Sequence, residues 1–299
     1  MALVHGIRLL EKARKRGYAV PAFNIQNMET VQAVFSACRK EDAPAFVQVT
    51  ESSIEYAGLE RLFKIADFEA ENSGLPACIH LDHGHRLDYI KWALETGFTS
   101  VMIDASKKEF SENMLLTKKV VSMAKKTGAS VEAELGALGK IGETPLTDPE
   151  QAKEFAKKSK CHSLAVAIGT SHGAYKFTGT PKLDLERLGA ISKLVKIPLV
   201  LHGASRVVPW AYEQASKYGA EISGAQGLPD SQLVKAVKLG IAKVNIDTDL
   251  RLSFTAGVRK VLATDRKNFD PRKYLSAGRA MVERTARQKI RVLGASGKA

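Results

Sequence analysis

The stretch Ile79-His80-Leu81-Asp82-His83-Gly84 carries an apolar run into a polar end that stops at a glycine. Two further segments end in the same way, Ile168-Gly-Thr-Ser-His172-Gly and Leu199-Val-Leu-His202-Gly. Short apolar runs bounded by a turn residue are typical of buried strands. A single histidine after a strand means little. Three on separate strand ends predict a zinc site, because catalytic zinc keeps three protein ligands and one open position.

Similar apolar runs recur along the chain and alternate with amphipathic stretches. We expect strands at 18–24, 45–50, 77–83, 100–105, 130–136, 163–169, 198–203 and 243–248, with helices at 28–40, 87–96, 112–126 and 230–238 among them. Strands that alternate with helices imply βαβ units and a parallel sheet. Because each strand is apolar on both faces, a closed (β/α)8 TIM barrel is favoured over an open sheet. No G-x-G-x-x-G follows the first strand, which disfavours a dinucleotide-binding fold.

The length of 299 residues lies within the range of single-domain α/β barrels, so we expect one domain over 1–299. Near the end of the chain, Asp270-Pro271 precedes an arginine-rich helical stretch that stops at Gly294. Asp at the N-cap, Pro at the first helical position and Gly after the last turn predict a capped helix. We therefore expect a C-terminal helical extension over about 270–299.

Composition limits the classes of partner. Three scattered cysteines, Cys38, Cys78 and Cys161, do not form a disulfide framework and favour a reducing cytoplasm. No apolar run approaches the roughly 20 residues that cross a bilayer, so no membrane partner is expected. The net charge of +13 is suited to drawing in anionic substrates. Neither zinc-finger spacing nor an RNP-type aromatic motif is present, so no nucleic acid is expected.

Polar residues stand at the carboxyl end of every expected strand, which is where barrels of this kind place their active sites. Several of them would be costly to bury without a purpose. They are Asn24, Thr50, Asp82 with His83, Asp104, Glu134, His172, His202, and the run Asn245-Ile246-Asp247-Thr248. This convergence predicts a site at the mouth of the barrel.

Two histidines flank Gly84, and they allow two interpretations. His83 and His85 point the same way along a strand, so both could reach a metal. Alternatively His83 alone binds metal and His85 lies in the following loop. We favour the second interpretation, which leaves Asp82 beside the metal as an acid–base group.

Three further acids have open roles. Asp104 and Glu134 either orient the histidines or offer a metal a second position, and the sequence does not separate these roles. Glu143 ends the glycine-rich stretch 136–143, which is either a mobile lid that brings this acid to the metal or a plain loop.

The ends of strands seven and eight predict an anion site. Gly203-Ala204-Ser205 and Asn245–Thr248 place backbone N–H groups and hydroxyls where barrels commonly bind phosphate. Gly173 permits a close backbone approach, and Lys176 adds a positive charge. The alternative is ordinary turn chemistry, since Gly, Ser and Asn are common turn residues.

Taken together, these residues resemble the class II, metal-dependent fructose-bisphosphate aldolases over nearly the whole chain. The most specific segments are Leu81-Asp-His-Gly84, Val131-Glu-Ala-Glu-Leu-Gly136, Gly169-Thr-Ser-His-Gly173, His202-Gly-Ala-Ser205 and Asn245-Ile-Asp-Thr-Asp249. The resemblance implies a lyase of glycolysis and gluconeogenesis. Such an enzyme reversibly cleaves fructose 1,6-bisphosphate to dihydroxyacetone phosphate and glyceraldehyde 3-phosphate, as a homo-oligomer (dimer or tetramer).

The resemblance also implies residue roles. His83, His172 and His202 would bind Zn²⁺ or another divalent metal, which polarises the ketone and stabilises the enediolate, and a monovalent cation is a further expected ion. Asp82 would handle the C4 hydroxyl proton, and Glu143 the proton at the nucleophilic carbon. The implied substrate-binding residues are Asn24, Thr50, Gly173, Lys176, Gly203, Ala204, Ser205, Asn245, Ile246, Asp247 and Thr248, with Arg251 and Arg272 for the far phosphate across a subunit boundary.

Rival functions remain. Related tagatose-bisphosphate aldolases share the metal residues but typically show Ala-Thr where this chain has Ile246-Asp247-Thr248, which favours fructose. A metal hydrolase on the same barrel commonly has His-x-His on strand one, where this chain has Asn24. A Schiff-base aldolase needs a lysine, and strand 163–169 has none. A non-catalytic scaffold does not explain the polar strand ends.

Three residues depart from the usual pattern of the family. Thr50 stands where serine is frequent, Arg206 follows Ser205 where small residues are frequent, and Lys140 interrupts the glycines of the expected lid.

Overall fold

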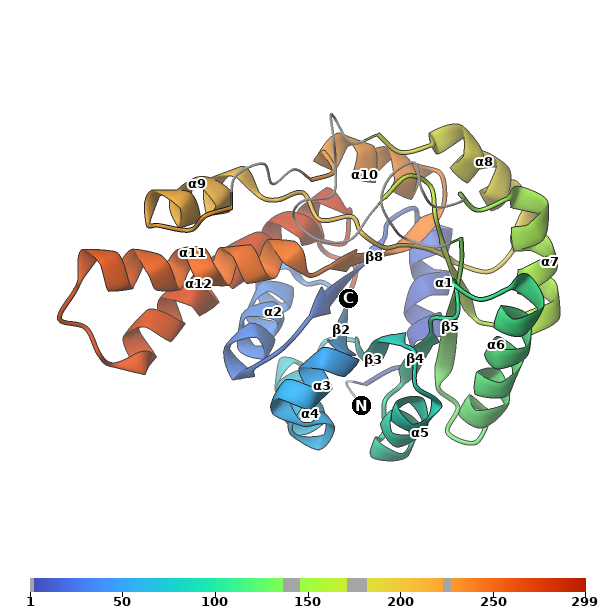
Figure 1. Cartoon of the computed structure of the whole chain (residues 1–299), viewed down its shortest axis with the longest axis horizontal. Coiled ribbons are helices and arrows are strands. Elements are labelled where there is room, and N and C mark those ends of the chain that lie inside the picture. Colours follow the sequence, from blue (N-terminus) through green and yellow to red (C-terminus); the bar gives the residue numbers. More distant parts are fainter. Residues whose placement is uncertain (1–2, 137–145, 171–181, 223–226) are drawn as a thin grey trace.

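The computed structural model describes residues 3–136, 146–170, 182–222 and 227–299. Within these ranges eight parallel strands pair in sequence order, and the last pairs with the first, so the sheet closes (Figure 1). The strands are β1 Val20–Asn24, β2 Ala45–Thr50, β3 Ala77–Gly84, β4 Ser100–Ile103, β5 Ser130–Leu135, β6 Ser163–Val166, β7 Leu199–Leu201 and β8 Ile241–Ile246. The predicted (β/α)8 barrel is confirmed.

Helices surround the barrel and fill the connections between strands. Those in the described part of the chain are α1 Gly6–Arg16, α2 Met28–Glu41, α3 Glu51–Ala57, α4 Leu59–Ser73, α5 Leu87–Thr96, α6 Phe110–Ala124, α7 Pro149–Ser159, α8 Leu185–Leu194, α9 Pro209–Lys217, α10 Asp230–Lys238, α11 Thr248–Thr264 and α12 Pro271–Val292. Their apolar faces bury residues such as Val31, Leu62 and Ile191 against the strands. The barrel wall and most of these helix faces form one apolar core, while Ala211 and Ala215 of α9 pack with Ala256 of α11 in a second, smaller cluster.

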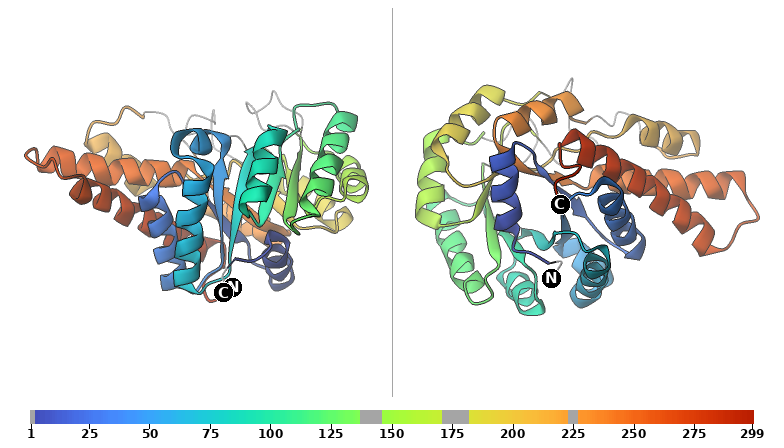
Figure 2. Two further views of the ribbon diagram at one scale, coloured as in Figure 1. Left: turned by 90° about the horizontal axis from the view of Figure 1, so that it is seen from below. Right: turned by 180° about the vertical axis from the view of Figure 1, so that it is seen from behind.

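Helix α1 covers the end of the barrel where the strands begin. A side chain at Gly6 would lie 2.7 Å from Ser130 Oγ and 2.8 Å from Phe46 Cζ, so only glycine permits this approach. Leu9, Leu10 and Ala13 are buried on the same helix. Figure 2 shows α1 at the same end of the molecule as the two termini. The carboxyl ends of the strands therefore form the open mouth.

Most strands are shorter at the mouth than the sequence predicts. β4, β6 and β7 leave the ladder at residues 103, 166 and 201, while the expected strands run to 105, 169 and 203. Strand β8 ends at Ile246, because Asp247 turns out of strand geometry (φ −126°, ψ −66°) and Thr248 begins α11. Asp104 and His202 thus directly follow the last residues of β4 and β7.

The capped C-terminal helix is confirmed as α12. Asp270 accepts a hydrogen bond from Arg272 N, Pro271 occupies the first turn, and Gly294 follows the helix at φ 71°. Helices α11 and α12 form a hairpin that projects to one side of the barrel beside α9 (Figure 1). The projecting part therefore consists of α11 and the first part of α12, while Ile290 and Leu293 lie in the core. Helix α12 returns to pack on α2.

None of the helices in the described ranges has the length and apolar character that a membrane crossing requires.

Candidate active site and metal centre

A bulge in β3 brings two consecutive side chains to the same side. Neighbouring strand residues normally face opposite ways. Here the register with β4 shifts between Leu81 and Gly84, and His83 adopts φ 49°, which is rare for a residue with a side chain. A side chain at Gly84 would lie 2.5 Å from Met102 O, so the bulge requires glycine there. As a result Asp82 Oδ1 lies 4.0 Å from His83 Nε2.

Amide side chains from three strands hold Asp82. Asn24 Nδ2 donates to its Oδ2 at 2.9 Å, and Asn245 Nδ2 donates to its Oδ1 at 2.9 Å. Gln48 Nε2 donates to Oδ2 at 3.2 Å and to Asn24 Oδ1 at 2.8 Å. Burial alone would raise the pKa of Asp82, but His83, Lys243 and His202 lower it to about 2. This carboxylate is therefore ionised and fixed in direction.

His83 and His202, the two expected metal ligands within the described residues, each have a carboxylate on at least one ring nitrogen. His83 Nδ1 lies 2.8 Å from Asp104 Oδ2, and His202 Nε2 lies 2.7 Å from Glu132 Oε1. The two rings meet edge to face with centroids 4.7 Å apart. Asp82, His83 and His202 each offer one ligand atom, and these atoms all lie within 4.8 Å of one another. A carboxylate behind a histidine is the usual way in which a metal-binding ring is oriented.

Asp104 and Glu134 occupy different places. Asp104 faces His83 Nδ1 and accepts from Ser106 Oγ at 2.7 Å. Glu134 Oε2 lies 3.2 Å from His202 Nδ1 and 4.0 Å from His83 Nδ1. His83, Asp104 and Glu134 form a second group whose ligand atoms lie within 4.8 Å. The arrangement thus offers two overlapping donor sets that share His83.

A buried ion pair, which the sequence analysis did not single out, lies beneath His202. Lys243 Nζ is 3.0 Å from Glu132 Oε2, and both side chains are inside the barrel. Burial opposes the charged form of Glu132, yet Lys243 and His202 hold the pKa of its carboxyl well below the usual value. Burial likewise opposes the charged form of His202, but Glu132 and Glu134 raise its pKa to about 10. A metal at Nδ1 would take the place of the proton there.

The two expected anion-binding segments lie side by side after β7 and β8. Gly203 has φ 62°, and Ala204 and Ser205 are buried. Ser205 O accepts from Leu228 N at 3.0 Å. Ile246 follows Asn245 on β8, so the alternation of strand side chains directs it toward the helices and leaves only its backbone near the mouth.

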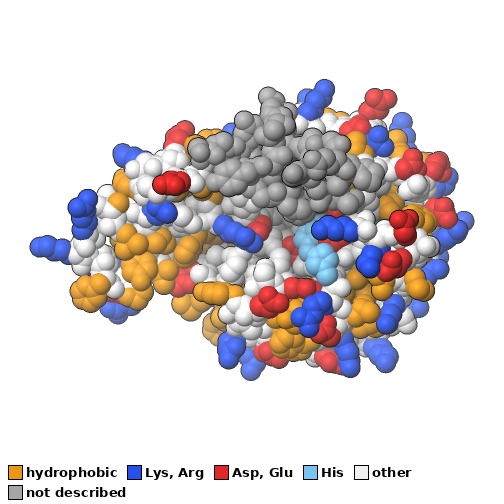
Figure 3. Space-filling model, viewed as in Figure 1, with side chains coloured by type: hydrophobic (Ala, Val, Ile, Leu, Met, Phe, Trp, Pro, Cys, Tyr) orange, Lys and Arg blue, Asp and Glu red, His pale blue; other side chains and the backbone are white. Residues whose placement is uncertain are grey.

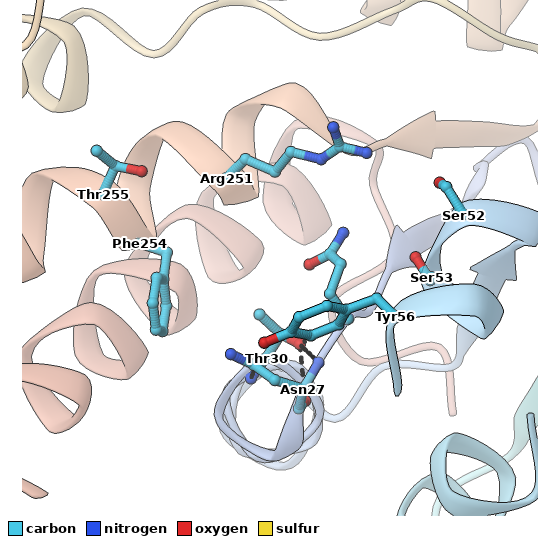
Figure 4. Close-up of a pocket in the computed structure, with 9 residues that line it drawn as sticks. Asn27, Thr30, Ser52, Ser53, Tyr56, Arg251, Phe254 and Thr255 are labelled. Carbon is cyan, nitrogen blue, oxygen red and sulfur yellow. Dashed lines mark hydrogen bonds between the residues drawn. The ribbon is translucent and has the colours of Figure 1, made fainter. Parts of the chain in front are cut away.

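A cavity of about 400 Å³ opens beside the β8 segment, where its lining residues Gln26 and Arg251 contact Asp247 (Figure 4). Arg251 on α11 lies on one side, and Ser52, Ser53 and Tyr56 of α3 lie on the other. Arg251 binds Asp247 through two contacts, Nε to Oδ1 at 2.8 Å and Nη2 to Oδ2 at 2.6 Å. A guanidinium at the rim of the cavity is thereby directed by the strand-eight segment.

Some expected site residues lie apart from the cluster. The Thr50 hydroxyl caps α3 by accepting from Ser53 N at 3.3 Å. Arg272 is 88% exposed and pairs with Asp270 at the start of α12. His85 is in the loop, where its backbone N–H donates to Glu51. Glu143, His172, Gly173 and Lys176 lie outside the described residues.

Comparison with known proteins gives the family. The model of the class II fructose-bisphosphate aldolases matches residues 4–298. The chain belongs to this family. A fructose-bisphosphate aldolase of Helicobacter pylori (strain ATCC 700392 / 26695) is 43% identical over 305 residues, which cover 99% of each chain. One of Thermus caldophilus is 44% identical over 305 residues, covering 99% of this chain and 100% of that protein.

The likeness extends to three dimensions. The crystal structure of the YdjI aldolase from Escherichia coli K12 superposes with a TM-score of 0.84 at 31% identity and covers 99% of both chains. As a class II aldolase, the chain is a metal-dependent lyase that acts on a phosphorylated sugar. The resemblance inferred from the sequence is confirmed.

The donor set of this class II aldolase fits a metal of the expected kind. Imidazole nitrogens and carboxylate oxygens are the ligands that zinc and other divalent transition metals take in proteins. The ring nitrogens that face Asp104 and Glu132 are occupied, which leaves His83 Nε2 and His202 Nδ1 as the atoms nearest Asp82 and Glu134. Both rings are thus turned with one nitrogen toward a common point.

Three site residues were missed at the level of sequence: Gln48, Glu132 and Lys243. Each has an apolar residue on either side of it in its strand. Each also stands two positions before a residue that was identified, namely Thr50, Glu134 and Asn245. Because strand side chains alternate, that spacing places each pair on one face. The spacing is a signal that could have found them.

Proposed function

We propose that this aldolase cleaves fructose 1,6-bisphosphate reversibly to dihydroxyacetone phosphate and glyceraldehyde 3-phosphate, with Zn²⁺ as its metal. The observation that carries the proposal is the position of Asp82. It is an ionised carboxylate fixed by three amides, and its Oδ1 lies 4.0 Å from a metal-facing nitrogen of His83. Cleavage beside a ketone needs a base and an electron sink next to each other, and this geometry supplies the base.

Asp82 is the acid–base group of the proposed reaction. In cleavage it accepts the proton of the C4 hydroxyl, and in synthesis it returns that proton. With a pKa of about 2 it is ionised at neutral pH, so it has a lone pair free to accept a proton. Asn24, Gln48 and Asn245 hold its two oxygens in place, so the proton is taken along one direction.

His83 and His202, together with His172 outside the described residues, would hold the metal. When bound, the metal polarises the substrate ketone and stabilises the negative charge that develops next to it. Asp104 and Glu132 keep the two described rings in the binding orientation. Glu134 lies close enough to His202 to serve as a further ligand during turnover. Glu143 is proposed to handle the proton at the nucleophilic carbon.

The substrate would lie across the mouth with one phosphate at the β7 and β8 segments. Ser205, Asn245 and Thr248 with the backbone of Gly203 and Ala204 would bind the dihydroxyacetone-phosphate half, joined by Gly173 and Lys176. Asp247 would contact the sugar hydroxyls. Arg251 at the rim of the cavity would take the far phosphate, because a guanidinium binds phosphate with two parallel hydrogen bonds.

We further propose that the enzyme is a homo-oligomer. Phe254 and Leu262 of α11 line a cavity of about 620 Å³ between α9 and α11, and Phe269 at the tip of the hairpin is 91% exposed. Figure 3 shows hydrophobic side chains gathered on this projecting arm. A second copy would cover them.

The three cysteines are buried and unpaired, which suits the cytoplasm, where we place the protein.

Substrate choice is tested directly by coupled assays with fructose 1,6-bisphosphate and tagatose 1,6-bisphosphate on the zinc-loaded enzyme. We expect a much higher kcat/KM for fructose 1,6-bisphosphate. A preference for tagatose 1,6-bisphosphate would overturn the sugar assignment. Separately, sedimentation as a monomer at assay concentration would overturn the proposal that the enzyme is a homo-oligomer.

A further inference from the structure

A buried group of charges joins the C-terminal helix to the loop after β7. Lys289 of α12 is 1% exposed, and its Nζ lies 3.0 Å from Asp249 Oδ2 and 3.4 Å from Asp230 Oδ1. Asp249 is fully buried in the first turn of α11, directly after the β8 segment. A lysine so deep in the protein needs a purpose, because its desolvation is costly.

The Asp249 carboxylate has a second set of partners on the other segment. Its Oδ2 accepts from Arg206 N at 2.9 Å, and its Oδ1 accepts from Val208 N at 3.2 Å. Both N–H groups lie just past Gly203-Ala204-Ser205. One carboxylate therefore links the loop after β7 to the residues after β8.

The loop needs this support, because its backbone is strained. Val207, between the two N–H groups that Asp249 accepts, has φ 55°. A β-branched residue at positive φ is a genuine outlier and persists only when its surroundings hold it there. The Arg206 side chain adds to the restraint by pairing with Asp230, which also contacts Lys289. The departure of Arg206 from the family pattern thus has a structural partner.

We propose that Lys289 is a positioning residue for the substrate phosphate site. It fixes Asp249, which in turn fixes the backbone after Ser205 against the β8 segment. The proposal rests on the proposed function, in which these two segments bind the phosphate of the dihydroxyacetone half. Lys289 itself does not touch the substrate.

Three variants separate positioning from mere stability. Lys289→Met leaves Asp249 buried without its cation. The double variant Asp249→Asn/Lys289→Met removes both charges. Because Arg206 N and Val208 N donate to different oxygens of Asp249, the single oxygen of the new amide can replace only one of these acceptors. Arg291→Met is the matched control on the same helix, because Arg291 binds Glu41 at 2.7 Å and has no contact with the loop among the described residues. For each, we would measure Tm, KM and kcat for fructose 1,6-bisphosphate, and amide exchange at residues 206 and 208.

Lys289→Met should lower Tm, speed exchange at both amides and raise KM about tenfold, the effect of losing one charge-assisted hydrogen bond, with a smaller change in kcat. In the double variant Tm should recover, because an uncompensated charge is no longer buried. Its KM and its exchange rates at the two amides should stay raised. Arg291→Met should lower Tm without changing KM.

Recovery of KM together with Tm in the double variant would overturn the proposal, as would unchanged KM and exchange in Lys289→Met. If Lys289→Met does not fold, the double variant still tests whether the Asp249–Lys289 pair holds the loop, because recovery of KM with Tm would overturn the proposal. Amide exchange needs no substrate. A wild-type enzyme that fails to cleave fructose 1,6-bisphosphate would therefore refute the proposed function, while the exchange data would still test whether Lys289 holds the loop.

Discussion

His202 Nε2 lies 2.7 Å from Glu132 Oε1 inside the barrel, so the opposite nitrogen of the ring faces Asp82 and Glu134. Lys243 Nζ lies 3.0 Å from the other oxygen of Glu132 and balances its charge. The three residues form a line from the barrel interior to the proposed metal. The tautomer and the orientation of the His202 ring are therefore set by Glu132, and Glu132 is in turn held by Lys243.

Removing Glu132 should weaken metal binding without removing a ligand. We expect Glu132→Gln to lower zinc affinity about 10- to 100-fold, the usual effect of losing an outer-shell partner of a histidine ligand. Chelator competition on the purified variant measures this. Glu150→Gln on the exposed first turn of α7 is the control, and equal zinc affinities in the two variants would remove Glu132 from the metal site.

His83 and His85 give a matched pair of substitutions on one segment. His83→Ala should lose both bound metal and cleavage, because a site with three histidine ligands cannot spare one. His85→Ala should keep its metal, since its ring faces Asp104 O in the loop at 3.0 Å. Metal analysis of both proteins decides the matter, and full occupancy in His83→Ala would refute its assignment. The same loss is expected for His172→Ala and His202→Ala.

Asp82→Asn tests the acid–base assignment. The variant should fold and bind metal, but its kcat should fall about 10²- to 10⁴-fold, which is the contribution typical of a positioned proton-transfer group. The amide keeps the size of the side chain, so metal content and Tm serve as internal controls. Near-normal turnover would show that another group accepts the C4 hydroxyl proton.

The far phosphate is tested through Arg251. Arg251→Ala should weaken the use of fructose 1,6-bisphosphate far more than that of fructose 1-phosphate, which lacks the second phosphate. The comparison of kcat/KM on the two sugars isolates that phosphate from general damage. An equal loss on both would place Arg251 outside phosphate recognition.

The stability that α12 gains by packing back against the barrel should depend on pH through the ionisation of Glu41. Hydrogen bonds from Arg291, joined by Arg287 and Ser296, outweigh the effect of burial and lower the pKa of Glu41 to about 2 from its usual 4.5. A depressed pKa stabilises the folded state above the unfolded value, and the contribution is lost as pH falls. The Tm gap between wild type and Glu41→Gln should therefore be full at pH 7 and narrow between about 4.5 and 2. A gap that widens on acidification would contradict this.

The sequence revealed those parts of the site that lie at strand ends. His83 and His202 were found because each follows an apolar run and precedes glycine, a pattern that chance rarely repeats. Glu132 and Lys243 were missed because each lies two residues before the polar end of its strand and has an apolar neighbour on both sides. Only closure of the barrel brings them within 3.0 Å of one another.

The bulge at His83 was also beyond the sequence. Simple alternation would separate Asp82 from His83, and only the register shift against β4 turns both toward the mouth. The expected strands also ran too far toward the mouth of the barrel. Asp247 was assigned to the strand, but its backbone leaves strand geometry and α11 begins at Thr248.

The central claim is that the chain cleaves fructose 1,6-bisphosphate with a bound divalent metal. The most direct measurement is the rate of triose phosphate release by the purified protein before chelation, after chelation and after zinc is restored. We predict cleavage that chelation abolishes and zinc recovers. Undiminished cleavage by protein shown to be free of metal, or no cleavage by fully zinc-loaded protein, would contradict the account.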